Sequence, residues 1–200
     1  MTNSFFALIS RMRHIKRWGL MRNSYQENIQ EHSHMTAVIA HALAVIRRDV
    51  LGRSADPAAA AAAALFHDAP EIITGDLPTP VKYLNAEISG AYKAVEKAAG
   101  EKLLEMLPPE LRPEYGRLLD CRDEDTLSLV KAADKLSAYI KCVEEIRAGN
   151  SEFRSAEQQI REALEQLPMP EVKYFIKNFM PSFGMTLDEL TKQQEGTVVR

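Results

Sequence analysis

Two imidazoles and two carboxylates stand at positions where a helical protein should carry apolar side chains. The dipeptide His67-Asp68 ends a run of alanines, and His32 lies in the first turn of an apolar-rich stretch. Asp134 shares a helical face with leucine and valine. Because an unpaired buried carboxylate costs several kcal/mol, these side chains need a partner. One divalent cation would satisfy all of them, and a mixed nitrogen and oxygen ligand set suits Mn, Co, Fe or Zn.

The spacing of His67 and Asp68 restricts where such a cation can lie. Consecutive residues of a helix point ~100° apart, so these two side chains cannot both face squarely in one direction. They can reach one ion if it lies in a groove between helices, with His32 and Asp134 approaching from neighbouring helices. The sequence therefore predicts a metal site built from several separate helices.

Each candidate ligand also has an ordinary explanation when it is taken alone. Asp68 can cap the helix that follows Pro70, and Asp134 can pair with a neighbouring lysine. A His-Asp dipeptide arises by chance in many chains of this length. It becomes a strong signal only in combination with an upstream histidine, a downstream aspartate and the adjacent Glu71.

The other histidines do not fit the same ion. His34 and His41 lie about 200° and 180° around the helix from His32, so they cannot point to the same place. We expect both of them, and His14, to be ordinary core or surface residues.

The elements that must position these residues are helices. Helical periodicity dominates, and no stretch alternates as a strand would. Asn28 followed by Glu31 forms a capping-box pattern, and Asp56-Pro57 marks a second helix start. Pro70 predicts a break in the alanine-rich helix, and two prolines and a glycine predict a loop at residues 75–80. We expect helices at about 5–12, 28–48, 57–69, 85–107, 125–148, 152–167, 171–179 and 187–193, and an all-α single domain over residues 1–200.

Length, charge and cysteine content exclude several classes of protein. A chain of 200 residues corresponds to about one domain. With 25 Lys+Arg against 28 Asp+Glu, the net charge of −3 lacks the basic excess of proteins that bind nucleic-acid polymers.

The longest apolar run is shorter than the ~20 residues that span a membrane, and the N-terminal apolar patch precedes its basic residues, the reverse of a signal peptide. Cys121 and Cys142 form no CxxC pattern, so we expect free thiols and a cytoplasmic location.

The order His32, His67-Asp68, Asp134 in an all-helical chain resembles the HD-domain metal-dependent phosphohydrolase superfamily. Further strings make the chain similar to the bacterial 5′-deoxynucleotidases of that superfamily, over nearly its whole length. These strings are Lys16-Arg17-Trp18, Glu31-His32-Ser33, His67-Asp68-Ala69-Pro70-Glu71, Thr74-Gly75-Asp76-Leu77-Pro78-Thr79-Pro80-Val81-Lys82-Tyr83 and Ala133-Asp134. The string from Asp76 to Tyr83 is the most specific to these enzymes.

The resemblance implies a cytoplasmic, homodimeric phosphomonoesterase that hydrolyses deoxyribonucleoside 5′-monophosphates and discriminates against ribonucleotides by a tight fit around the sugar 2′ carbon. It also implies one divalent cation per chain, such as Co, Mn or Zn. The implied metal ligands are His32, His67, Asp68 and Asp134. The residues implied to border the nucleotide are Arg17 at the phosphate, Trp18 at the sugar, His32, Asp68, Asp76, Leu77, Pro78, Thr79 and Asp134.

The residue chemistry agrees with such a reaction. A bound cation lowers the pKa of its water and polarises a phosphoryl oxygen, and the forked guanidinium of Arg17 suits a phosphate. Glu71 lies three and four positions after Asp68 and His67, near enough for general acid or base work. Trp18 could instead be a core anchor. Asp76 is a candidate for the 3′-hydroxyl, and Lys82 is a second candidate for the phosphate.

Two other interpretations remain open from the sequence. Another HD chemistry, a phosphodiesterase or a nucleoside triphosphate hydrolase, would keep the metal site and change the residues around Arg17-Trp18 and Asp76. A helical metal-binding scaffold without turnover is the alternative outside enzymes. Glu71 argues against the scaffold, because a purely structural metal site has no need of a free carboxylate.

Overall fold

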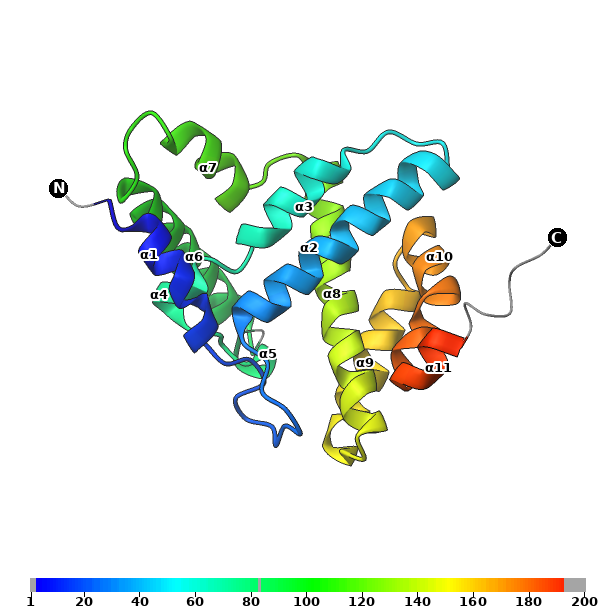
Figure 1. Cartoon of the computed structure of the whole chain (residues 1–200). Coiled ribbons are helices and arrows are strands. Elements are labelled where there is room, and N and C mark those ends of the chain that lie inside the picture. The colour runs from blue at the N-terminus through cyan, green and yellow to red at the C-terminus, as the bar shows by residue number, and fades with distance from the viewer. Residues whose placement is uncertain (1–2, 83, 193–200) are drawn as a thin grey trace.

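Two long helices, α2 (Ile29–Val45) and α8 (Glu124–Arg147), cross at the centre of the molecule, and α3 (Pro57–Phe66) lies alongside α2 (Figure 1). The structure is a computed structural model that describes residues 3–82 and 84–192. Over these ranges the chain has no strand, only an isolated antiparallel bridge between Lys16 and Asn28. The predicted all-α fold is confirmed. The single domain over residues 1–200 stays a prediction, because residues 1–2, 83 and 193–200 lie outside the described part.

Both predicted helix starts at the centre of the fold are present. The Asn28 side chain accepts hydrogen bonds from the Gln30 and Glu31 N–H groups, and the Glu31 side chain accepts one from the Asn28 N–H, which completes the capping box. The Asp56 side chain caps α3 with Pro57 in its first turn. After α2 the chain continues as a π-helix (Ile46–Val50), close to the predicted end at about residue 48. Local capping chemistry therefore sets where these helices begin.

The alanine-rich helix ends earlier than predicted. α3 stops at Phe66 rather than near residue 69, and Ala69 donates its N–H to the Phe66 carbonyl in a tighter turn. Pro70 has no N–H to donate to that carbonyl, so the helix cannot be continued through it. A short helix, α4 (Glu71–Thr74), begins directly after the turn. His67 and Asp68 consequently lie at the break between two helices.

One side of the molecule is formed by α1 (Phe5–Ile9), a 3-10 turn (Ser10–His14), α4, α6 (Ala86–Glu105) and α7 (Arg112–Leu119). α7 was not predicted. Pro113 lies in its first turn, where a missing N–H is not needed, so a proline that suggests a break is compatible with the helix. These elements enclose a small core centred on Phe5, Leu103 and Leu107.

The loop predicted at residues 75–80 is only partly irregular. Gly75 adopts a φ of +73°, and residues 75–78 have no regular structure. A short helix, α5 (Thr79–Lys82), then begins inside the predicted loop. Pro80 is the second residue of α5, a position at which proline fits a helix. The predicted loop therefore ends at residue 78.

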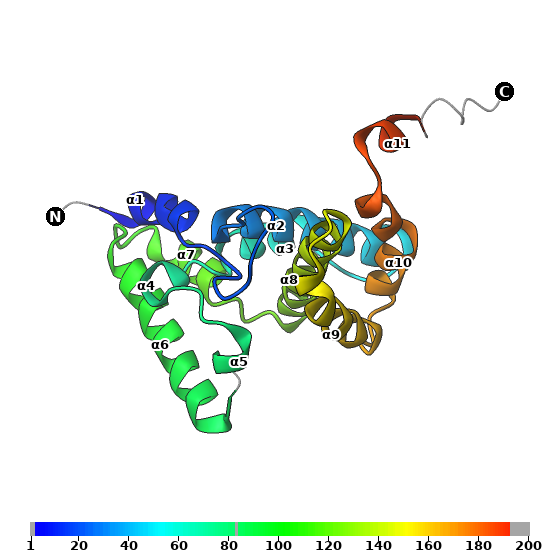
Figure 2. The same ribbon diagram turned by 90° about the horizontal axis from the view of Figure 1, so that it is seen from below.

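The opposite side is formed by 3-10 turns (Ser151–Phe153 and Met180–Gly184) and by α9 (Arg154–Glu165), α10 (Pro170–Asn178) and α11 (Leu187–Lys192). In Figure 2 these helices lie at the far end of the molecule from α6. The main core runs from α2, α3 and α8 to α10 and includes Leu43, Leu136 and Phe175. Cys121 and Cys142 are free thiols, as expected. None of the described helices is long and apolar enough to cross a membrane.

A buried ion pair connects α10 to the π-helix that follows α2. Arg47, in the π-helix, donates from Nε to Glu171 Oε1 at 2.8 Å, and from Nη2 to the same oxygen. Glu171 is fully buried, and Arg47 is only 4% exposed. Removing Glu171 leaves the buried Arg47 with only the exposed Asp125, 3.3 Å from its Nη1, as a carboxylate partner.

We therefore expect Glu171→Ala to lower the free energy of unfolding by about 3–5 kcal/mol, measured by urea denaturation. Asp49→Ala breaks the exposed pair with Arg48 and is the control, with little expected change in the free energy of unfolding because water screens this pair. Equal losses in both variants would contradict a special contribution from the buried pair.

Candidate metal and nucleotide site

Three of the four predicted metal ligands meet at the break between α3 and α4. His32 comes from the first turn of α2, His67 caps the C-terminus of α3, and Asp68 follows it. One candidate ligand atom from each of the three lies within 4.8 Å of the other two. His67 Nε2 lies 3.2 Å from Asp68 Oδ1, and His32 Nε2 lies 3.7 Å from Asp68 Oδ2. Two nitrogens and a carboxylate at this spacing are a donor set for a divalent transition-metal cation.

The hydrogen bonds of His67 leave the nitrogen nearest Asp68 available. Its Nδ1 lies 2.7 Å from the carbonyl oxygen of Ala64. A carbonyl only accepts, so Nδ1 carries the proton and Nε2 keeps its lone pair. That Nε2 is buried without a hydrogen-bond partner among the described residues. A buried lone pair with no donor fits the metal ligand that the sequence predicted.

Asp134 joins the cluster through His32. Its Oδ1 lies 2.9 Å from His32 Nε2, and its side chain is 42% exposed. Lost solvation acts to raise the pKa of Asp134, but the hydrogen bond with His32 and the charge of Arg17 hold it below the ordinary value. The other His32 nitrogen, Nδ1, lies 3.2 Å from Ser137 Oγ, one turn along α8. Asp134 is therefore adjacent to the three-atom set rather than part of it.

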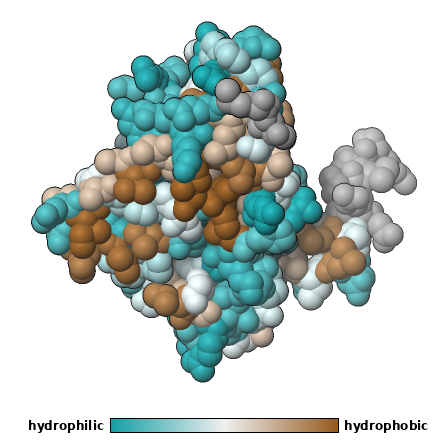
Figure 3. Space-filling model, turned by 90° about the vertical axis from the view of Figure 1, so that its left-hand side faces the viewer, coloured by the Kyte–Doolittle hydropathy of each residue, from teal (hydrophilic) through white to brown (hydrophobic). Residues whose placement is uncertain are grey.

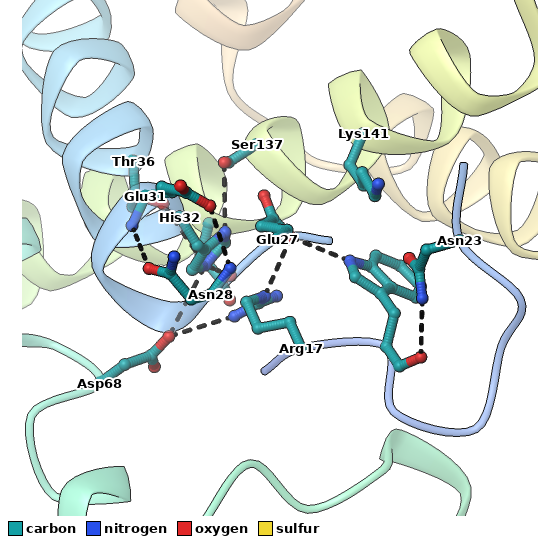
Figure 4. Close-up of polar contacts among 12 residues, drawn as sticks. Arg17, Asn23, Glu27, Asn28, Glu31, His32, Thr36, Asp68, Ser137 and Lys141 are labelled. Carbon is teal, nitrogen blue, oxygen red and sulfur yellow. Dashed lines mark hydrogen bonds and ion pairs between the residues drawn. The ribbon is translucent and has the colours of Figure 1, made fainter. Parts of the chain in front are cut away.

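Arg17 reaches the cluster from the segment between α1 and α2. Its Nη1 donates to Asp68 Oδ2 at 3.1 Å, as Figure 4 shows. Burial acts to lower the pKa of Arg17, but the carboxylates of Asp68, Asp134, Glu27 and Asp76 raise it above the ordinary value. The guanidinium is therefore a permanent positive charge beside the candidate metal ligands.

Trp18 has an unusual backbone conformation. Its φ of +58° is the only positive φ of a non-glycine residue in the described ranges. The indole N–H donates to Glu27 Oε2 at 2.9 Å, and the ring centroid lies 5.3 Å from that of Phe153. Trp18 is partly exposed, so it is anchored at one edge and reachable at the other. A strained backbone at a bulky residue is found most often at functional sites.

Glu71 is a buried acid, only 6% exposed, and its Oε2 has no hydrogen-bond partner in the described part of the chain. Burial, and then the negative charges of Asp68 and Asp76, raise the pKa of Glu71 to about 9. Burial also raises the pKa of Asp76. Without a bound cation, Glu71 therefore holds a proton at neutral pH.

The segment predicted to contact the nucleotide leads from the site to α5. Asp76, Leu77 and Pro78 are partly buried in it, and the side chain of Thr79 lies outside the described part, as does Tyr83. Lys82 donates to Glu96 at 2.8 Å and lies over the Tyr92 ring. Lys82 is thus already engaged by α6, which makes it a weaker phosphate candidate than Arg17.

A groove of about 1210 Å³ between α3, α6 and α7 borders the site. His67 and Glu71 line it, whereas Arg17, Trp18 and Asp76 do not. The groove therefore does not coincide with the predicted nucleotide site. His14, His34 and His41 are exposed and outside the cluster, as expected.

Two residues of the site were missed by the sequence analysis. Glu27 contacts both Arg17 and Trp18, and Ser137 orients His32. Ser137 lies three positions after Asp134, a spacing that places it on the same side of α8 and could have drawn attention to it. Glu27 precedes a helix cap, where an acidic residue is common, so its sequence position carries no signal.

Two of the solved structures with a similar fold are described as HD phosphohydrolases. An HD-domain phosphohydrolase from Listeria innocua matches with a TM-score of 0.79 and 24% identity, over 98% of each chain. The cyanophage S-2L HD phosphohydrolase DatZ, described as bound to dA and one catalytic Zn²⁺ ion, matches with a TM-score of 0.60 and 21% identity, over 90% of this chain and 96% of that one. At these identities the likeness establishes the fold.

The sequence itself establishes the family. A family model described as 5′-deoxynucleotidase YfbR-like matches residues 4–183. A 5′-deoxynucleotidase of Erwinia tasmaniensis is 48% identical, over 94% of this chain and 96% of that protein. The 5′-deoxynucleotidase YfbR of Shigella flexneri is 47% identical, with the same coverage. Together with the ligand geometry, these matches show that the chain belongs to the YfbR-like 5′-deoxynucleotidase family.

Proposed function

We propose that the protein is a metal-dependent phosphomonoesterase that converts deoxyribonucleoside 5′-monophosphates to deoxyribonucleosides and phosphate, selectively over ribonucleotides. The observation that carries the proposal is the convergence of His32, His67, Asp68 and Arg17 in a chain of this family. Three of them offer ligand atoms to a cation, and the fourth offers fixed positive charge to a phosphate. A site with both features is suited to phosphate-ester hydrolysis.

The residues present fit a divalent cation, with His32, His67, Asp68 and Asp134 as its holders. The unpartnered Nε2 of His67 supports this assignment. The hydrogen bond between His32 Nε2 and Asp134 requires a proton on that nitrogen, and a cation held there would require the other tautomer, with the proton on Nδ1, where Ser137 Oγ can accept it. A divalent cation at this place supplies a more acidic water and a polarised phosphoryl oxygen.

Arg17 is the proposed phosphate ligand. Its guanidinium is held at Nε by Glu27 and at Nη1 by Asp68, which restricts the plane of the group. The remaining N–H donors form a fork that matches two phosphate oxygens. Arg17 thus offsets the negative charge of the substrate beside the carboxylates of the metal site.

Glu71 is the proposed general acid and base. In the metal-free protein a pKa of about 9 leaves Glu71 protonated at neutral pH, and a protonated carboxyl is the form that can donate to a leaving 5′-oxygen. After that transfer, the carboxylate can accept a proton from the attacking water. The cation would lower this pKa, because a nearby positive charge favours the carboxylate.

The sugar is assigned to Trp18 and to the segment Asp76, Leu77, Pro78 and Thr79. A pocket that encloses the sugar 2′ carbon would leave a ribose hydroxyl without a hydrogen-bond partner. Such a buried polar group costs ~1–3 kcal/mol, which corresponds to roughly 5- to 150-fold discrimination. The anchored edge of Trp18 supports a rigid wall at this place.

A cytoplasmic homodimer completes the proposal. Two free thiols, Cys121 and Cys142, support a reducing compartment. Apolar side chains gather on the face formed by α1, α4 and α6, where Phe6, Ile73 and Val95 are exposed (Figure 3). An apolar patch of this kind is suited to contact with another protein chain.

The first test is a panel of deoxyribo- and ribonucleoside 5′-monophosphates, assayed by phosphate release after metal removal and readdition of Mn, Co, Zn or Mg. We expect no release without metal and preferential release from the deoxy substrates, because the ribose 2′-hydroxyl lacks a partner in the pocket. Equal rates on deoxyribo- and ribonucleoside monophosphates would contradict the proposed selectivity. Release from cyclic nucleotides or triphosphates instead would favour another HD chemistry.

The second test is Glu71→Gln. We expect kcat to fall by about 10²–10⁴-fold, because the amide cannot transfer the proton, while metal content and nucleotide binding are retained. Glu101→Gln, an exposed acid on α6, is the matched control and should keep full activity. Undiminished turnover in Glu71→Gln would exclude Glu71 from the reaction.

The third test uses the pH dependence of stability in metal-stripped protein. Because folding raises the pKa of Glu71 from 4.5 to about 9, its contribution to stability is complete below pH ~4.5, declines as pH rises and is lost above about 9. Glu71→Gln has no such proton to lose. Its stability relative to wild type should therefore increase between pH 5 and 8.5 in urea unfolding, and parallel pH profiles would contradict the raised pKa.

A further inference from the structure

A single carboxylate, that of Glu27, contacts both side chains assigned to substrate recognition. Its Oε2 accepts the indole N–H of Trp18 at 2.9 Å and lies 3.3 Å from Nε of Arg17. Its carbonyl oxygen also accepts the backbone N–H of Arg17 at 2.9 Å. Glu27 is only 9% exposed, and Figure 4 places it between α8 and the guanidinium of Arg17. Three interactions therefore connect this one residue to two consecutive residues of the site.

The two carboxylates around Arg17 have different positions on it. Glu27 lies at Nε, whereas Asp68 accepts from Nη1. A guanidinium is planar, so charges at two of its nitrogens fix both its position and its rotation. Asp68 alone, as a single contact, would leave that rotation free. The Nε of Arg17 has no hydrogen-bond partner in the described part of the chain, so Glu27 acts on the guanidinium through its charge and favours one direction of the remaining N–H donors.

Trp18 needs support because its backbone is in the left-handed region. A φ of +58° is unfavourable for a bulky side chain and persists only where surrounding contacts impose it. The backbone carbonyl of Trp18 accepts hydrogen bonds from Met21 N–H at 2.9 Å and from the Asn23 side chain at 3.3 Å. These bonds fix the backbone but leave the ring orientation to Glu27 and Phe153.

The rest of the segment between α1 and α2 is held by other residues. Glu145 on α8, fully buried, accepts the Ser24 N–H at 2.9 Å, and Lys141 donates to the Tyr25 carbonyl at 2.7 Å. Glu144 accepts from the Tyr25 hydroxyl on the outer side of the same segment. The segment therefore keeps its place on α8 without the Glu27 side chain.

We propose that Glu27 is a positioning residue that orients Arg17 and Trp18 together, so that phosphate binding and sugar discrimination depend on one carboxylate. The proposal rests on the proposed function for the roles of Arg17 and Trp18 in the reaction. The physical link between the three side chains does not depend on it. Replacing Glu27 disturbs both recognition elements at once, while the fold and the metal ligands are kept.

The test compares Glu27→Ala and Glu27→Gln with a matched control, Glu144→Gln, which changes a carboxylate of α8 that contacts the same segment through Tyr25. We expect Glu27→Ala to lower kcat/KM for a deoxyribonucleoside 5′-monophosphate by about tenfold or more, mainly through KM, because a hydrogen bond to a charged group is lost. The ratio of deoxy to ribo rates should fall in parallel. Glu27→Gln keeps an oxygen that accepts the indole N–H but carries no negative charge. We therefore expect its ratio of deoxy to ribo rates to be closer to wild type than its KM is. The control should match wild type in KM and in the ratio of deoxy to ribo rates.

A second readout needs no substrate. Trp18 is the only tryptophan, so the intrinsic fluorescence reports on its surroundings alone. We expect Glu27→Ala to increase acrylamide quenching in the metal-free protein, while Glu144→Gln leaves quenching unchanged. Thermal unfolding of each variant verifies that the fold is retained. The loss of sugar discrimination in Glu27→Ala and Trp18→Phe should also be less than additive, because both break the same hydrogen bond.

The two readouts separate the proposal from the function on which it rests. A wild-type protein inactive on every deoxyribonucleotide would overturn the proposed function, whereas quenching would still test the positioning of Trp18. Unchanged quenching in a folded Glu27→Ala protein would overturn the positioning role. In an active enzyme, a fall in kcat/KM with unchanged quenching and an unchanged deoxy/ribo ratio would limit Glu27 to Arg17 and contradict the coupling.

Discussion

The site depends on the contacts of one carboxylate, Asp68. Arg17 Nη1 lies 3.1 Å from it, His67 Nε2 3.2 Å and His32 Nε2 3.7 Å. Among these three groups, Arg17 supplies the positive charge and the hydrogen-bond donor that a carboxylate largely withdrawn from water needs. They arrive from three different parts of the chain: the segment before α2, the start of α2 and the end of α3. Asp68 therefore connects the three elements that form the site. A cation bound there and Arg17 would both interact with the negative charge of Asp68.

Two backbone features make this convergence possible. The turn at Ala69 and Pro70 ends α3, so that His67, which keeps helical φ and ψ, and Asp68 both lie at the C-terminal end of this helix. The segment that carries Arg17 is fixed to α8 by the buried charges of Lys141 and Glu145. The break between α3 and α4 thus places His67 and Asp68, and the hydrogen bonds to α8 place the segment that carries Arg17.

Much of the fold could be predicted, because its signals are local. The capping box at Asn28 and the Asp56 cap were found because each depends on residues at most three positions apart. One error has a clear physical cause: the prolines of residues 75–80 were taken to predict a loop, yet Pro80 lies in the first turn of α5, a position that accepts proline. At the site, Glu27 was missed because its partners, Arg17 and Trp18, become neighbours only when the segment folds back on itself.

The sequence by itself determined the helical class, the order of the candidate ligands, the acid at Glu71 and the family, because these follow from residue types and spacing along the chain. The tertiary structure decided which nitrogen of His67 is available, how far burial raises the pKa of Glu71, and which carboxylate orients Arg17 and Trp18. A tautomer depends on the nearest acceptor, and a pKa depends on the surrounding charges and on access to water. Those surroundings exist only after α2, α3 and α8 have packed.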